Sequence, residues 1–61
     1  MRPHRAHSPG LTGVLSLRES RHLLEVLRAK VGDRFTVFDV DREALAEVVE
    51  LGPPVRYRIL E

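Results

Sequence analysis

The sequence of 61 residues contains no cysteine, so neither a disulfide nor a cysteine-based zinc site can stabilise its fold. Tryptophan is absent too, and one tyrosine and two phenylalanines are the only aromatic residues. A domain of this size buries only roughly 60% of its unfolded surface, so its stability must come from aliphatic packing. No apolar run approaches the roughly 20 residues of a membrane span, and no signal peptide pattern is seen, so we expect a cytoplasmic protein.

Asparagine and glutamine are also missing, and nine of the ten basic residues are arginine. Few thermolabile residues and many charges are typical of a thermophile protein, although a computational redesign would leave a similar composition. Hydrophobic residues make up 43% and charged residues 31%, which indicates a folded chain and not a disordered tail. We expect a single domain over residues 1–61.

Charge is unevenly spread along the chain. Residues 1–34 hold seven basic and three acidic side chains, whereas residues 35–61 hold three basic and six acidic ones. This asymmetry predicts a basic face in the N-terminal half. A solvated surface on which both signs interleave remains an equal alternative.

Turn residues divide the chain into short elements. We expect an extended start over residues 1–7, a turn at residues 8–10 and a strand over Gly13–Leu17. A helix follows, with Ser16 or Ser20 as its N-cap and Gly32 as the left-handed residue after its end. Its core-facing stripe is predicted to be Leu23, Leu24, Val26 and Leu27.

The C-terminal half has the composition of strands. Residues 34–39 are predicted to form a central strand and residues 55–60 another. Residues 43–51 are ambiguous, because their composition favours a helix and their alternation favours a strand. The order of elements indicates a mainly β fold, a small barrel with one α-helix plugging an end, since closure removes exposed strand edges.

Arginine side chains are the candidate ligands for nucleic acid. Arg18, Arg21 and Arg28 are predicted to share the outer helix face, where they could contact phosphates. The alternative is a solvated face in which Glu25 pairs with Arg21. Arg2 and Arg5 should face opposite sides of the first strand, and Arg56 and Arg58 one side of the last, paired with Glu47 or Glu50.

Histidines and aromatics do not suggest a second site. His4 and His7 lie three residues apart on a strand with no third ligand in the pattern, so we expect no metal site. Phe35, Phe38 and Tyr57 are better explained as core residues than as a stacking platform. Asp39 and Asp41 are expected to serve the turn around Val40.

The stretch "ESRHLLEVLRAKVGDRFTVFD" resembles the N-terminal domain of bacterial RsmE-type methyltransferases. The matching pattern is His22, then Val26-Leu27-Arg28, then Gly32-Asp33, then Phe38-Asp39, followed by a strand pair. The resemblance covers essentially the whole chain. Its spacing is fairly specific, whereas no single motif in it is.

The resemblance implies a PUA-like RNA-binding domain. Such enzymes methylate a uracil ring nitrogen of one uridine in 16S ribosomal RNA, using S-adenosylmethionine in a knotted C-terminal domain. The chain alone is therefore expected to be no enzyme and to bind no cofactor. The residues expected to bind ribosomal RNA are Arg2, Arg5, Arg18, Arg21, His22 and Arg28. By the same resemblance, residues 43–51 become a strand.

Two departures from the family pattern suggest an alternative. Val40 stands where the family usually has a glycine suited to positive φ, and His7 stands where it tends to have an aromatic residue. Both would suit an engineered protein-binding scaffold, with a designed contact patch that includes His7, Val40 and Asp41. Its partner would then be a protein target.

Overall fold

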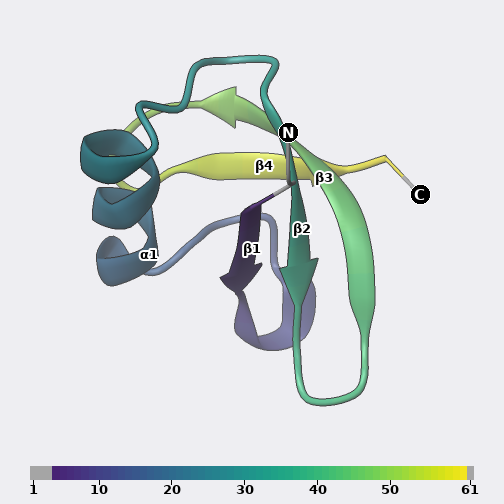
Figure 1. The fold of residues 1–61 in the computed structure, drawn as a ribbon. Helices are drawn as coiled ribbons and strands as arrows, with labels where there is room; N and C mark the ends of the chain where they lie inside the picture. Colours follow the sequence, from purple (N-terminus) through teal and green to yellow (C-terminus); the bar gives the residue numbers. More distant parts are fainter. Residues whose placement is uncertain (1–3, 61) are drawn as a thin grey trace.

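The computed structural model describes residues 4–60 and shows the expected mainly β fold. One mixed sheet has the strand order β1 (His4–His7), β2 (Arg34–Phe38), β3 (Glu43–Glu50) and β4 (Arg56–Ile59) (Figure 1). β1 runs parallel to β2, whereas β2, β3 and β4 pair in antiparallel fashion. A parallel pair needs a long crossover, and residues 8–33 provide it.

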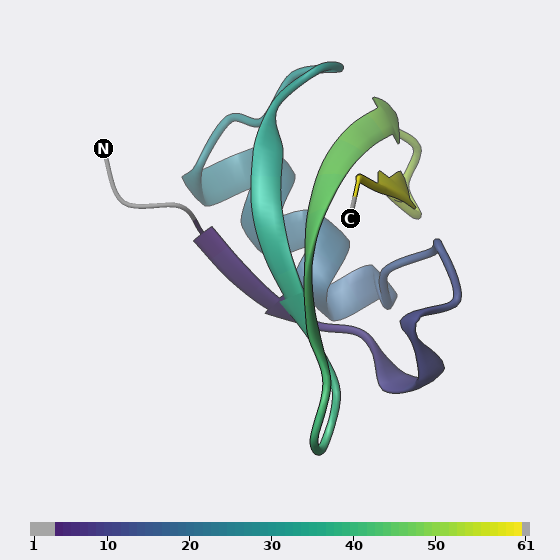
Figure 2. The same ribbon diagram turned by 90° about the vertical axis from the view of Figure 1, so that its right-hand side faces the viewer.

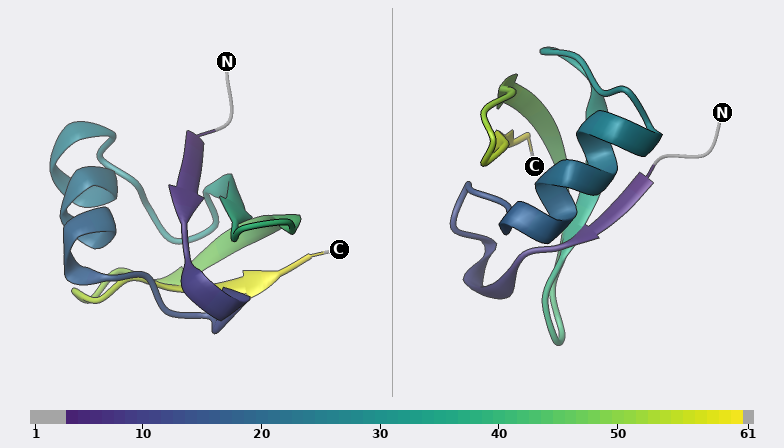
Figure 3. Two further views of the ribbon diagram at one scale, coloured as in Figure 1. Left: turned by 90° about the horizontal axis from the view of Figure 1, so that it is seen from below. Right: turned by 90° about the vertical axis from the view of Figure 1, so that its left-hand side faces the viewer.

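The crossover carries the helical part of the fold. It begins with the short 3-10 turn η1 (Pro9–Leu11) and continues with α1 (Leu17–Arg21), which passes directly into the π-wound segment η2 (His22–Val26). α1 and η2 lie across one side of the sheet (Figure 3). The N-cap prediction is confirmed at Ser16, whose Oγ accepts a hydrogen bond from the Glu19 N–H at 3.2 Å.

The predicted core stripe of the helix is wrong beyond Leu24. Leu23 is buried and Leu24 partly buried, but Val26 is 65% and Leu27 44% exposed. The reason lies in the winding: the Leu27 N–H donates to the His22 carbonyl, five residues back, at 3.3 Å. Each residue of such a segment advances by less than the α-helical angle, so the later side chains rotate away from the core.

The core lies between the helical part and the inner face of the sheet. It consists of Ala6, Leu15, Leu23, Phe35, Val37, Ala46, Val48, Val55 and Tyr57. The Phe35 and Tyr57 rings meet edge to face, 5.7 Å apart, so these two aromatics pack as predicted. The ambiguous residues 43–51 form a strand, as their alternation of apolar and charged residues indicated. This strand, β3, buries Ala46 and Val48 on its inner face.

The sheet is open, so the expected barrel is not confirmed. β1 and β4 are its two edges, and within residues 4–60 they do not pair with each other. Residues 8–15 bridge the gap, where the Ser8 Oγ and Tyr57 hydroxyl form a buried hydrogen bond of 2.7 Å. The strand predicted over Gly13–Leu17 shrinks to one bridge, Val14 with Arg56, because Ser16 already caps the helix. Figure 2 shows the strong twist of the open sheet.

Candidate nucleic-acid interface

The cations from α1 to the start of β2 are not neutralised. Residues 18–34, called the cationic segment below, contain Arg18, Arg21, Arg28, Lys30 and Arg34, all exposed. None of these five forms an ion pair with a carboxylate of the described residues. They therefore present five positive charges to solvent on three consecutive parts of the fold: the helix, the following loop and the first residue of β2.

The acidic residues of the cationic segment do not pair with these cations. The Glu19 carboxylate accepts the His7 backbone N–H at 3.3 Å, and the Asp33 carboxylate accepts the Lys30 backbone N–H at 2.9 Å. The Glu25 carboxylate makes no ion pair within residues 4–60, so the predicted Glu25–Arg21 pair does not form. Backbone N–H groups, and not guanidinium groups, are thus the partners of the Glu19 and Asp33 carboxylates.

The expected helix-face row of arginines is only partly present. Arg18 and Arg21 lie one turn apart on α1, and exposed His22 follows as its C-cap residue. Arg28 does not continue this row, because the helix ends at Val26 and Arg28 has a left-handed backbone, with φ of 53°. The left-handed residue after the helix is thus Arg28. Gly32 also has positive φ, 97°, but lies in the loop before β2.

Cations elsewhere on the sheet are paired. Arg58 meets Glu47 at 2.7 Å and Arg56 meets Glu50 at 3.8 Å, as predicted for the outer face of β3 and β4. Arg5 meets Glu43 at 2.7 Å and lies 4.9 Å over the Phe38 ring centroid. Arg5 is therefore the least available of the described RNA-binding candidates. Arg2, a further candidate, lies outside the described residues.

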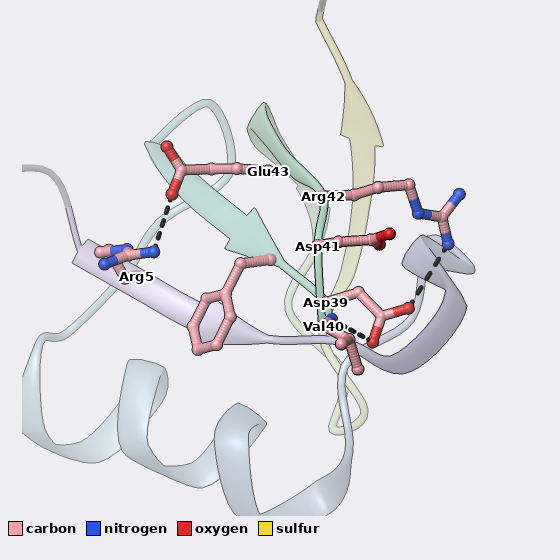
Figure 4. Close-up of a pocket in the computed structure, with 7 residues that line it drawn as sticks. Arg5, Asp39, Val40, Asp41, Arg42 and Glu43 are labelled. Carbon is pink, nitrogen blue, oxygen red and sulfur yellow. Dashed lines mark hydrogen bonds and ion pairs between the residues drawn. The ribbon is translucent and has the colours of Figure 1, made fainter.

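A hollow of about 280 Å³ lies under the turn between β2 and β3 (Figure 4). Its lining residues are Arg5, Phe38, Asp39, Val40, Asp41, Arg42 and Glu43. The Arg5–Glu43 pair closes one side, and Arg42 meets Asp39 at 3.4 Å on the other. Three carboxylates face two neutralised guanidinium groups, so this hollow is a poor place for a phosphate.

Asp39 holds the turn in place, as expected for a carboxylate that serves it. Its side chain accepts the Gly10 N–H at 2.9 Å and the Val40 N–H at 2.8 Å. Those two hydrogen bonds, with a smaller contribution from Arg42, hold the pKa of the Asp39 carboxyl below its ordinary value of 3.8. The carboxylate thereby links the hairpin to the η1 turn.

The alternative contact patch receives no support from the surface around Val40. Val40 is 96% exposed, but its neighbours Asp39, Asp41 and Arg42 are charged, so no apolar cluster surrounds it. The φ of Val40 is not positive. In the described chain, Arg28 and Leu11 are the only residues besides glycine with positive φ. His7 is exposed and lies 5.3 Å from the Phe38 ring, which explains why a histidine is tolerated there.

Two further features are absent from the described part of the chain. Residues 4–60 contain no group of three or more His, Cys, Asp or Glu side chains placed to hold a metal ion. The same residues include no helix long and apolar enough to cross a bilayer.

Lys30 and Arg34 are unpaired cations that the sequence analysis did not select. Lys30 follows the helix, where a cation interacts favourably with the helix dipole, and Arg34 is the first residue of the strand predicted over residues 34–39. The sequence feature that includes both Lys30 and Arg34 is the excess of basic residues in the N-terminal half. Which of those residues lack an ion pair depends on the fold and could not be predicted from spacing.

The comparisons with known proteins agree with this geometry. A family model described as the RNA methyltransferase PUA domain matches residues 16–54, which include the entire cationic segment. A solved structure from Legionella pneumophila, assigned as a methyltransferase and in complex with bound cofactor SAM, superposes with a TM-score of 0.83 and 29% sequence identity. The match covers 97% of this chain but only 27% of that one. A search of curated proteins gives no match.

The family match extends over well more than half of the 61 residues, and the structural match over nearly all of them. The chain spans about a quarter of the methyltransferase that it superposes on. The open mixed sheet, its covering helix and the unpaired cations thus belong to a PUA-like domain, and the chain is a member of the RNA methyltransferase PUA domain family.

Proposed function

We propose that this domain binds RNA through the cationic segment and serves as the accessory domain of a methyltransferase that acts on a uridine of 16S ribosomal RNA. The observation that carries the proposal is the set of five cations without ion pairs, whereas Arg5 on β1, Arg42 in the hairpin turn, and Arg56 and Arg58 on β4 are paired. Most hydrogen bonds to nucleic acid go to phosphate and sugar, and arginine is suited to both.

Within this proposal Arg18, Arg21, His22 and Arg28 contact RNA, joined by Lys30 and Arg34. Arg5 would contribute only after leaving Glu43, and Arg2 precedes the described residues. The domain itself is non-catalytic. Catalysis and SAM binding would belong to the rest of a longer protein, as suggested by the SAM-bound structure that extends far beyond the matched part. The setting would be the cytoplasm, where ribosomal RNA is accessible.

Binding is tested by fluorescence anisotropy with a labelled small-subunit ribosomal RNA fragment at about 50 mM and about 200 mM salt. Each phosphate contact on a single strand contributes about 0.7 to the slope of log K against log salt, so contacts by the five unpaired cations predict a slope of about −3.5. The Arg18→Ala/Arg21→Ala double variant should bind about tenfold more weakly at low salt, if each lost contact is worth about 0.7 kcal/mol.

The matched control is Arg56→Ala/Arg58→Ala, which removes the same charge from residues already paired with Glu50 and Glu47. This control should bind much more tightly than the helix double variant. Absence of binding by the wild type at low salt, or an equal loss in both double variants, would contradict the proposal. Equal competition by an unrelated RNA would contradict only the ribosomal preference.

A further inference from the structure

Arg28 occupies a backbone conformation that its side chain disfavours. Its φ of 53° lies in the left-handed region, where the Cβ crowds the following carbonyl oxygen. The helix end imposes this conformation: the Leu27 N–H donates to the His22 carbonyl at 3.3 Å, and the Ala29 N–H reverses to reach the Leu23 carbonyl at 3.0 Å. Glycine is the usual residue at such a position.

Leu11 shows what normally compensates for this conformation. It is the other residue besides glycine with positive φ, 48°, among those described. Its side chain is partly buried and packs against the core, so the contacts of the side chain offset the disfavoured backbone. Arg28 has no such compensation, because it is exposed and makes no ion pair within residues 4–60.

The helix dipole is the remaining structural reason for a cation at this position. That interaction is weak at an exposed site and is screened by salt. Lys30, two residues further on, offers a second cation to the same helix end. The fold therefore gains little from the guanidinium group of Arg28.

We infer that Arg28 is the phosphate anchor of the cationic segment, retained for RNA at the expense of domain stability. This inference rests on the proposed function. The two hydrogen bonds that flank Arg28 fix its backbone, so the root of its side chain is held in place before RNA arrives. Its planar guanidinium group can then bind a phosphate in a bidentate manner, which an ammonium group cannot.

The test is the Arg28→Gly substitution, with two readouts expected to move in opposite directions. Thermal unfolding at about 200 mM salt should show a Tm about 2–5 °C higher, because glycine relieves the left-handed backbone. Anisotropy with the labelled ribosomal RNA fragment should show about tenfold weaker binding at low salt, with the salt slope reduced by about 0.7. Arg28→Lys, which keeps the charge, should leave Tm unchanged and give an intermediate affinity.

Two controls identify the source of each change. Leu11→Gly also relieves a left-handed backbone, but it removes a side chain that packs against the core. The Tm of this variant should therefore fall. Arg56→Ala removes one paired charge and should leave the salt slope nearly unchanged. A lower Tm for Arg28→Gly would show that Arg28 serves the fold and would overturn the inference.

Unchanged RNA binding by Arg28→Gly would also overturn the inference. If the wild type still binds and the Arg18→Ala/Arg21→Ala variant binds about tenfold more weakly, the proposed function stands and only the anchor role fails. If the wild type does not bind RNA, both fail.

Discussion

At the scale of single residues, two buried serines hold the crossover against the sheet. Ser20 is fully buried, and its Oγ accepts the Val55 N–H at 2.8 Å. Ser8 is buried likewise and bonds the Tyr57 hydroxyl at 2.7 Å. Both bonds join segments far apart in the sequence and satisfy polar groups that have no access to water.

Replacing Ser20 by alanine should destabilise the domain by about 1–3 kcal/mol, because the buried Val55 N–H would lose its acceptor. In a domain this small, each kcal/mol shifts Tm by about 4–8 °C. Chemical denaturation followed by circular dichroism measures the change. Thr12→Ala is the control, since the exposed Thr12 hydroxyl makes one long bond of 3.4 Å and its loss should cost less than about 0.5 kcal/mol. Equal midpoints for Ser20→Ala and the wild type would contradict this role.

The role of Ser20 also shows a limit of sequence analysis. Its spacing made it a rival N-cap, whereas the structure gives the cap to Ser16 and places Ser20 inside the core. A serine near the start of a helix is compatible with both positions. The choice depends on a backbone N–H from residue 55, a contact that no local pattern contains.

At the scale of elements, the turn between β2 and β3 behaves as its sequence predicts. The chain reverses after Phe38, and the Asp39 N–H donates to the Arg42 carbonyl at 2.9 Å. The Asp39 carboxylate adds bonds to Val40 and to Gly10 of η1. The hairpin is therefore joined to the crossover through one ionised group.

Because the pKa of Asp39 is lower in the folded chain than its ordinary value of 3.8, its charge stabilises the fold above that pH. This contribution is lost as the pH falls through the folded pKa. We expect Asp39→Asn to be less stable than the wild type at neutral pH, and the difference to shrink below about pH 4. Urea titrations at several pH values measure it. A difference that does not change with pH, or one matched by Asp41→Asn, would exclude this explanation.

Other elements were predicted with unequal success, and the reason is physical. β2 followed from its aromatic and β-branched composition, which is a local property of the sequence. The strand nature of β3 followed only from the family resemblance, because composition and alternation disagreed over residues 43–51. The end of the helix did not follow, because the π-wound segment and the left-handed Arg28 change the direction of the chain where the pattern still fits a regular helix. Gly13–Leu17 failed as a strand since its extended run stops at the Ser16 cap.

At the scale of the whole molecule, paired and unpaired charges occupy different parts of the fold. The unpaired cations follow α1 and the loop that leads to the start of β2, whereas the hairpin turn lies at the other end of β2 (Figure 1). The basic N-terminal half of the sequence anticipated this division. The alternative of interleaved, neutralised charge holds for the outer face of β3 and β4, for the Arg5–Glu43 pair and for the hairpin turn. The closed barrel expected from the sequence is not confirmed, because residues 8–15, and not a β1–β4 pairing, fill the space between the two edge strands.

The most direct test of the account is a nuclear magnetic resonance titration of the isotope-labelled domain with the ribosomal RNA fragment. We predict that the largest amide shift changes fall within residues 17–34, with small changes at residues 39–42 and in β4. At higher salt all of these changes should diminish together, as expected for contacts to phosphate. The largest changes at the hairpin turn, or changes spread evenly over the sheet, would contradict the claim that the unpaired cations form the RNA surface.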